Sequence, residues 1–269
     1  MIRLGTTFIR VANLEKQLDF YRQVIGLQIH RQDGNTAFLG VGGADLLALI
    51  HTPEGQRLPG GNGLYHFALL LPSRHHLALT LRHFITRQTE LQGLSDHIVS
   101  EAIYLADPEG NGIEIYADRP REQWYRDGEF QLATLPINLR DLLREADGAD
   151  TGAHQLPPGT IMGHMHLHVN ALDEAAAFYQ DTLGMAMMMH IPSAGFLSYE
   201  GYHHHLGINT WAGRTSRADN ALGLDHFTVI LPEQEIANMR EHLPASAAQD
   251  GGWLLTDPSM NRVKVTAAE

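Results

Sequence analysis

The sequence predicts an α+β protein built from four βαβββ modules, and three observations support this class. Long stretches of the first half of the chain reappear in the second half. In each copy, short segments with alternating apolar residues follow a segment whose apolar residues have helical spacing. Turn signals rich in Asp, Pro, Gly and Asn separate the short segments. The chain is therefore expected to contain two copies of a unit that itself holds two modules.

An internal repeat determines the organisation of the chain. Residues 4–27 align without gaps with residues 162–185, and both segments contain a Phe-Tyr pair followed by a glycine. Two further pairs of segments match, and these are 64–72 with 224–232 and 107–115 with 257–265. Because a repeat of this length corresponds to a structural unit, the two halves are expected to share one fold.

The first module shows the pattern on which the element prediction depends. Leu14, Leu18, Tyr21 and Ile25 fall at helical spacing, and Gly26 is suited to end the helix. A strand pattern precedes this helix, and further strand patterns separated by turn residues follow it. The same order predicts modules at about 4–52, 64–118, 160–211 and 222–267.

Three regions are expected along the chain. An N-terminal domain of two modules covers 1–119, a linker covers 120–159, and a C-terminal domain of two modules covers 160–269. The linker is polar, has one amphipathic stretch at 137–146 that predicts a short helix, and ends in Pro-Pro-Gly. This composition is typical of a connecting segment and not of a domain core.

The composition excludes several classes of partner and of chemistry. The formal net charge is −12, with no block of Lys or Arg, so neither nucleic acid nor an anionic membrane surface is expected as a partner. The chain has no cysteine, which excludes disulfides and thiolate ligands, so a metal site must use His and carboxylate. We find no signal peptide and no apolar run that could span a membrane, and expect a cytoplasmic protein.

Several motifs in the repeats point together to one family. A His lies near the start of the first strand of a module, and a Phe-Tyr pair lies in the helix that follows such a strand. The predicted hairpin "DPEGNGIEI" at 107–115 lies at the end of module two. These motifs resemble the vicinal oxygen chelate superfamily, which includes glyoxalases, bleomycin resistance proteins and extradiol dioxygenases. Residues 95–120, "GHMHLHV" and "GYHHHLGINTW" are similar to the two-domain catechol 2,3-dioxygenases. The resemblance covers nearly all of the chain outside the linker.

The resemblance implies a fold of two domains with cupped mixed sheets, in which first and last strands supply metal ligands. The superfamily also contains isomerases and drug-binding proteins, so the fold alone does not determine the function. The ligand position on the four first strands then falls at Thr6, His66, His164 and His226.

The last strands decide between the pairings of modules. Module two offers Glu114, where module four has Lys264, and a protonated ammonium cannot ligate a cation. Only modules two and three together supply two histidines and one carboxylate, which are His66, His164 and Glu114. This set is the facial triad of non-haem Fe(II) oxygenases, and Mn(II) accepts the same ligands.

The resemblance implies Fe(II)-dependent extradiol cleavage of a catechol, with both atoms of O₂ inserted into the product. In the resembling enzymes a histidine beside O₂ moves protons, and its expected counterpart here is His205. Strand alternation would place His203 on the same face as His205, and His204 on the opposite face. Tyr104 matches a tyrosine that contacts substrate oxygen, and His97 is a further candidate on the substrate side.

Two other functions remain open at this point. A glyoxalase-type lyase or isomerase would use Zn or Ni and a second carboxylate, but the fourth position here is expected to be His205. A non-catalytic binding protein of the same fold would not need the ligand set. The catechol, the choice between iron and manganese and the oligomeric state are also open, although relatives often self-associate.

Other histidines and methionines have simpler interpretations. His166 and His168 alternate onto the face of His164 and are expected to line the cup or to support the ligands. His226 is expected to be a packed residue, because its module lacks the acid. The run "MAMMM" at 185–189 follows a helix end and is interpreted as adaptable core filling, not as a copper site.

Overall fold

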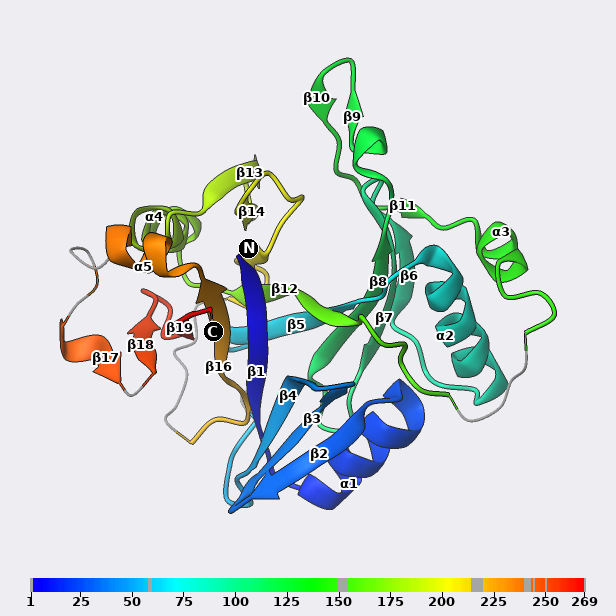
Figure 1. Cartoon of the computed structure of the whole chain (residues 1–269), viewed down its shortest axis with the longest axis horizontal. Helices are drawn as coiled ribbons and strands as arrows, with labels where there is room; N and C mark the ends of the chain where they lie inside the picture. The colour runs from blue at the N-terminus through cyan, green and yellow to red at the C-terminus, as the bar shows by residue number, and fades with distance from the viewer. Residues whose placement is uncertain are drawn as a thin grey trace.

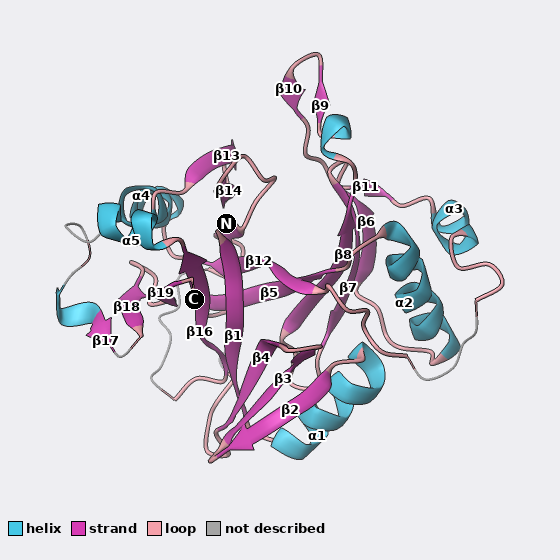
Figure 2. Cartoon of the chain, in the orientation of Figure 1, coloured by secondary structure: helices cyan, strands magenta, loops and turns pink. Residues whose placement is uncertain are grey.

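The computed structural model describes residues 2–57, 60–149, 154–213, 220–239, 243, 245–249 and 251–268. It contains one eight-stranded and one nine-stranded mixed sheet, with the helices packed outside them (Figure 2). This confirms the predicted α+β class with two cupped sheets. None of the described helices is long and apolar enough to cross a membrane.

The first two modules each begin with a strand and a helix, followed by three strands. Module one consists of β1 (Arg3–Val11), α1 (Leu14–Phe20), the π-helical turn η1 (Tyr21–Ile25), β2 (Gln28–Asp33), β3 (Thr36–Val41) and β4 (Ala44–His51). Module two consists of β5 (Gly63–Leu70), α2 (Arg74–Thr86), β6 (Gly93–Asp96), β7 (Ser100–Ala106) and β8 (Gly112–Asp118).

The last two modules repeat this order after the linker. Module three consists of β12 (Ile161–His168), α4 (Leu172–Leu183), β13 (Ala186–Ile191), β14 (Ala194–Ser198) and β15 (Leu206–Asn209). Module four consists of β16 (Gly223–Leu231), α5 (Glu233–Met239), η3 (Ala245–Ala247), β17 (Ala248–Gln249), β18 (Gly252–Thr256) and β19 (Arg262–Ala267).

The two sheets do not follow the order of the chain (Figure 1). One has the strand order β17-β18-β19-β16-β1-β4-β3-β2, and the other has the order β11-β6-β7-β8-β5-β12-β15-β14-β13. At the centre of each sheet, two first strands pair antiparallel: β1 with β16, and β5 with β12. Modules two and three therefore share a sheet, as the ligand positions predict. Each sheet combines strands from both sides of the linker.

The Phe-Tyr pair and the "DP" turn of the repeat are joined by one buried contact. Tyr21 Oη donates to Asp107 Oδ2 at 2.9 Å, and Tyr179 Oη donates to Asp257 Oδ2 at 3.0 Å. The other oxygen of each aspartate accepts backbone N–H groups two and four residues later, which closes the turn. The helix of module one is thus tied to the last hairpin of module two, and module three is tied likewise to module four.

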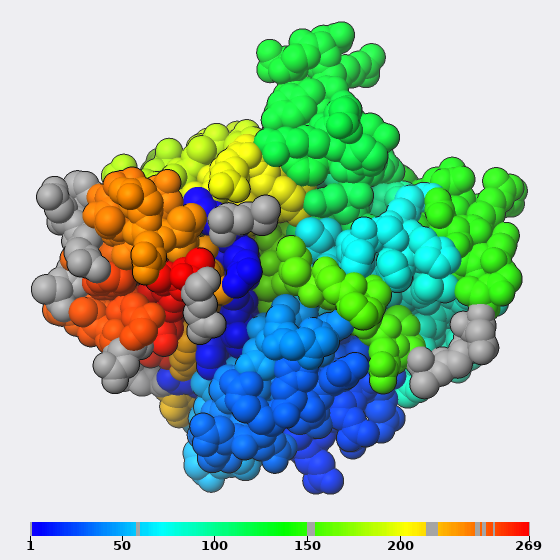
Figure 3. Space-filling view, in the orientation of Figure 1, coloured from blue at the N-terminus to red at the C-terminus, as the bar shows by residue number. Residues whose placement is uncertain are grey.

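The linker contains the expected short helix and four elements that the sequence did not predict. The helix is α3 (Leu139–Arg144). Before it come η2 (Arg121–Gln123) and a hairpin of β9 (Tyr125–Arg126) and β10 (Glu129–Phe130), which projects from the body of the molecule (Figure 3). The short strand β11 (Leu135–Pro136) then pairs with β6 and extends the nine-stranded sheet. The linker therefore forms part of the module two–three cup.

Candidate metal centre

Three neighbouring strands bring the predicted ligands together. In the register of the nine-stranded sheet, Ala68 of β5 lies beside Glu114 of β8 on one side and His164 of β12 on the other. His66 lies two residues before Ala68 and therefore on the same face of β5. The small side chain of Ala68 leaves space for the three polar side chains to approach one another above it.

The donor atoms of the three side chains face one another at short distances. His66 Nε2 lies 3.0 Å from Glu114 Oε2, and His164 Nε2 lies 3.1 Å from the same oxygen. The two Nε2 atoms are 3.3 Å apart. All three residues are buried, and within the described part of the chain they form the one group of three such donors that could hold a metal ion.

The protonation of these groups fits a cation. Burial lowers the pKa of His66, which favours the neutral imidazole that ligates metals. Burial alone would raise the pKa of Glu114, but His164 and His66 outweigh it and hold that pKa well below its usual range. A divalent cation would accept a lone pair from each of the three donor atoms. Two neutral imidazoles and a carboxylate are a suitable ligand set for Fe(II) or Mn(II).

A glycine and two rings enclose His164. A Cβ on Gly163 would lie 2.0 Å from Tyr116 Oη, so only glycine at this position lets the tyrosine pack beside β12. The His164 ring centroid lies 4.9 Å from that of Tyr116 and 4.1 Å from that of His204. This explains the glycine in "GHMHLHV".

The structure places Tyr104 and His97 together beside the ligands. Tyr104 lies opposite Glu114 in the β7–β8 pair, and burial raises its pKa well above the usual value, so the phenol stays protonated. His97 Nε2 lies 2.7 Å from Tyr104 Oη, and His97 Nδ1 lies 2.6 Å from the Ala133 carbonyl oxygen. A carbonyl only accepts, so Nδ1 carries the proton and Nε2 accepts the Tyr104 O–H.

The structure corrects the predicted position of His205. Its Nδ1 lies 2.8 Å from Ser198 Oγ, and it does not line the cavity over the triad; His204 does. The alternation rule fails here because β15 begins only at Leu206, so the three histidines lie in a bend and not in a strand. Burial lowers the pKa of His205 to about 4.

The other two residues of the run form a chain that ends at His204. His203 Nε2 lies 2.9 Å from Asp118 Oδ1, and its Nδ1 lies 2.8 Å from His204 Nδ1. An ionised carboxylate only accepts, so a neutral His203 donates from Nε2 and accepts at Nδ1. His204 must then donate from Nδ1, which leaves the lone pair of its Nε2 for the cavity.

The remaining predicted positions have structural partners. His168 Nδ1 lies 2.7 Å from Asn209 Oδ1, whereas His166 lines the cavity. In the other sheet, Thr6 donates to the Asp45 carbonyl, and His226 lies 2.7 Å from Asp225 Oδ2 and stacks on Phe8. Residues 186–189 of the "MAMMM" run lie in β13, Met185 is buried just before this strand, and Met189 lines the cavity.

A cavity of about 600 Å³ lies over the triad. One side of its described lining comes from module two, which contributes His97 and Tyr104, and the other comes from module three. Residues 132–134 of the linker also line it, which sequence reasoning missed because no periodicity marks this segment. A volume of this size is in the range of small-molecule sites, about 300–1,000 Å³.

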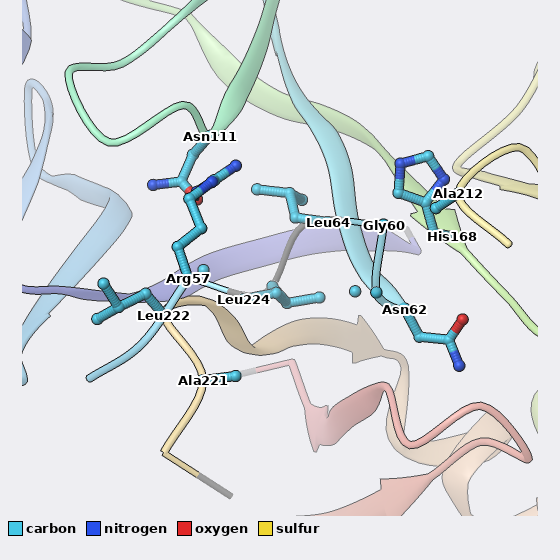
Figure 4. Close-up of a pocket in the computed structure, with 13 residues that line it drawn as sticks. Arg57, Gly60, Asn62, Leu64, Asn111, His168, Ala212, Ala221, Leu222 and Leu224 are labelled. Carbon is cyan, nitrogen blue, oxygen red and sulfur yellow. The ribbon is translucent and has the colours of Figure 1, made fainter. Parts of the chain in front are cut away.

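A second pocket lies where the two sheets meet, and its lining differs (Figure 4). Its volume is about 150 Å³, and Arg57, Asn111 and His168 are among its polar residues. The Arg57 guanidinium donates to Asn111 Oδ1 at 3.2 Å and to the Gly110 carbonyl. Its described lining contains no carboxylate, so the triad cavity is the candidate active site.

Comparison with known proteins agrees with this geometry. The chain is 42% identical over 269 residues to the catechol-2,3-dioxygenase of Bacillus subtilis (strain 168), covering 95% of this chain and 93% of that protein. It is 29% identical over 122 residues to a lactoylglutathione lyase of Neisseria meningitidis serogroup A, covering 42% of this chain and 88% of the lyase.

The fold is also similar to a solved structure. Glyoxalase I from Zea mays superposes with a TM-score of 0.59 at 15% identity, covering 99% of this chain and 92% of that one. Residues 3–115 match the Glyoxalase/Bleomycin resistance protein/Dioxygenase superfamily. The chain therefore belongs to this superfamily, also called the vicinal oxygen chelate superfamily, and is related over nearly its whole length to a catechol 2,3-dioxygenase.

Proposed function

We propose that this protein is a metal-dependent extradiol dioxygenase that opens the ring of a catechol with O₂. The observation that supports this most directly is the buried set of His66, His164 and Glu114, of which His66 and Glu114 line a cavity. These residues would hold Fe(II), with Mn(II) as the alternative. The extensive similarity to a protein named catechol-2,3-dioxygenase supports the same reaction.

The metal would supply one site at which a catechol and O₂ meet and exchange electrons. Two neutral imidazoles and one carboxylate leave part of the coordination sphere for these two molecules. The ligand set also separates this proposal from a glyoxalase-type isomerase, which needs a second carboxylate. Among the described residues, no further carboxylate joins the three donors.

Residues around the triad would handle protons and orient the substrate. Tyr104 donates a hydrogen bond to His97 and lies opposite Glu114. Its oxygen can therefore accept a hydrogen bond from a catechol hydroxyl and orient it. His204 Nε2 presents a lone pair to the cavity beside His164 and would take a proton there. Burial and the neighbouring histidines lower the pKa of His204 well below its usual value, so its imidazole is neutral and able to accept that proton. His203 and Asp118 behind it fix the tautomer of His204. His204 thus takes the role predicted for His205.

The direct test is oxygen consumption by protein loaded with Fe(II) under anaerobic conditions and then given catechol and air. We expect O₂ uptake together with a yellow ring-opened product, and loss of both in Glu114→Ala. Asp33→Ala is the matched control, because it removes an exposed carboxylate far from the triad in sequence. This variant should retain activity. Stoichiometric iron binding without O₂ uptake on any catechol would overturn the proposal and favour a glyoxalase-type reaction.

A further inference from the structure

We infer that the cavity selects a catechol with an uncharged apolar ring substituent over one with a carboxylate substituent. This inference rests on the proposed function, because it takes the two catechol oxygens to face the triad. Three properties of the cavity support it: its size, the lack of Lys and Arg in its described lining, and the apolar side chains that gather on one side.

The cavity is much larger than an unsubstituted catechol requires. Its volume of about 600 Å³ extends from the triad to the side chains of module three and the linker. A ring held by its two oxygens at His66, His164 and Glu114 would leave most of this space unfilled. A substituent on the ring is therefore needed to displace water from the outer part of the cavity.

The described lining includes no Lys or Arg that could pair with a substrate carboxylate. The one carboxylate in the described lining is that of Glu114, a proposed metal ligand. The polar residues on the β6 and linker side are uncharged: Gln92, Ser95 and Thr134. A substrate carboxylate would lose hydration there without gaining an ion pair with Lys or Arg.

The module three side of the cavity is apolar and partly exposed. Met189 and Ile191 of β13, Phe196 of β14 and Trp211 after β15 line it. Ile191 is 40% exposed and Trp211 is 51% exposed, and both lie on this one side of the cavity. Tyr65, at the same cavity, is 40% exposed. Apolar surface gathered at the wall of a cavity indicates an apolar ligand group.

Hydrogen bonds and a ring contact hold Trp211 in place on this side of the cavity. Trp211 Nε1 donates to Ser193 Oγ at 3.0 Å, and the Trp211 backbone N–H donates to Asn209 Oδ1 at 3.0 Å. The Trp211 ring centroid lies 5.3 Å from that of Tyr65 in an edge-on contact. Because these rings are already held in place, binding of a flat or branched apolar substituent would cost the protein little side-chain entropy.

The test compares three catechols on the Fe(II)-loaded protein: catechol, 4-tert-butylcatechol and 3,4-dihydroxybenzoate. We expect kcat/KM to be at least about tenfold higher for the alkylated compound than for the carboxylated one. Anaerobic calorimetry should give the same order of affinities, independently of turnover. Equal or better use of 3,4-dihydroxybenzoate would overturn the inference, whereas inactivity with all three compounds would overturn the proposed function instead.

Two variants test the wall itself. Trp211→Ala should lower the ratio of kcat/KM for 4-tert-butylcatechol over catechol by about tenfold, and Ile191→Arg should raise the relative use of 3,4-dihydroxybenzoate by a similar factor. Tyr125→Ala, which removes an exposed ring from the projecting hairpin, is the matched control and should leave both ratios unchanged. Unchanged ratios in both wall variants would contradict the assignment of the substituent to this side.

Discussion

The tautomers of the histidines around the cavity follow from partners that can only accept a proton. The Ala133 carbonyl fixes the proton of His97 on Nδ1, and the Asp118 carboxylate fixes that of His203 on Nε2. In consequence, Tyr104 donates to His97, and His204 keeps an accepting Nε2 toward the cavity. Tyr104 and His204 can both take part in proton transfer, and they lie beside different ligands: Tyr104 beside Glu114, and His204 beside His164.

The roles of His204 and His205 can be separated by substitution. His204→Asn should lower kcat by about 10²-fold or more, because general acid–base catalysis contributes roughly 10²–10⁴. Iron affinity should stay within a few-fold of the wild-type value, since His204 is not one of the three donors. His205→Asn should retain kcat within a few-fold. Steady-state oxygen uptake and iron titration of both variants give these values, and the reverse order would restore His205 to the catalytic role.

At the scale of elements, the repeated motifs in the sequence were reliable where they describe strands and turns. Strand period and repeat position placed Tyr104, Glu114 and His164 in strands, and all three lie inside regular strands of the structure. The same rule failed for 203–205, which form a bend, and for 132–134, which have no periodic pattern. Such segments take their conformation from distant contacts that a single sequence does not display.

The buried "DP" turn should be a major determinant of stability. Asp107 accepts hydrogen bonds from the backbone of Glu109 and Asn111, from the Asn111 amide and from Tyr21 Oη. Asp107→Ala leaves these donors buried without an acceptor, and should lower the free energy of unfolding by about 3 kcal/mol. Urea denaturation measures this loss.

The control for this variant is Asp33→Ala, which alters an exposed carboxylate at the end of β2. It should change the free energy of unfolding by no more than about 0.5 kcal/mol. A loss for Asp107→Ala as small as that of the control would show that the turn is not the tie between module one and module two.

At the scale of the whole molecule, the internal repeat predicted both sheets but only one complete ligand set. The sheet of modules one and four keeps the strand arrangement, yet Arg10 and Arg262 pair with Asp225, and the pKa of Asp225 falls to about 2, although burial alone would raise it. His226, at one ligand position of this sheet, contacts Asp225 of the same network, and Thr6, at another, donates to the Asp45 carbonyl. The sequence showed this loss through Thr6 and Lys264, but it could not show the ion-pair network.

The stability of the whole chain should fall between pH 6.5 and pH 4. Burial, with a contribution from His83, lowers the pKa of His154 to about 4, and the two rings stack at 4.3 Å. In this interval the unfolded chain binds more protons than the folded one. Each histidine with such a lowered pKa therefore reduces the free energy of unfolding by up to about 1.4 kcal/mol for each pH unit of acidification. Urea denaturation at pH 7.5, 6 and 5 measures the slope.

The His154→Phe variant isolates this contribution, because phenylalanine keeps an aromatic ring but does not titrate. Its free energy of unfolding should decrease less than that of the wild type as the pH falls from 6.5. A pH dependence identical to that of the wild type would show that His154 takes up its proton equally well in the folded chain.

The central claim is that His66, His164 and Glu114 hold one metal ion per chain, and anaerobic calorimetric titration with Fe(II) tests it most directly. We predict a stoichiometry of one ion per chain in the wild type and an affinity at least about 10²-fold lower in Glu114→Ala, with His226→Gln unaffected. Two ions per chain, or undiminished binding in Glu114→Ala, would contradict the account, because the metal would then lie elsewhere in the molecule.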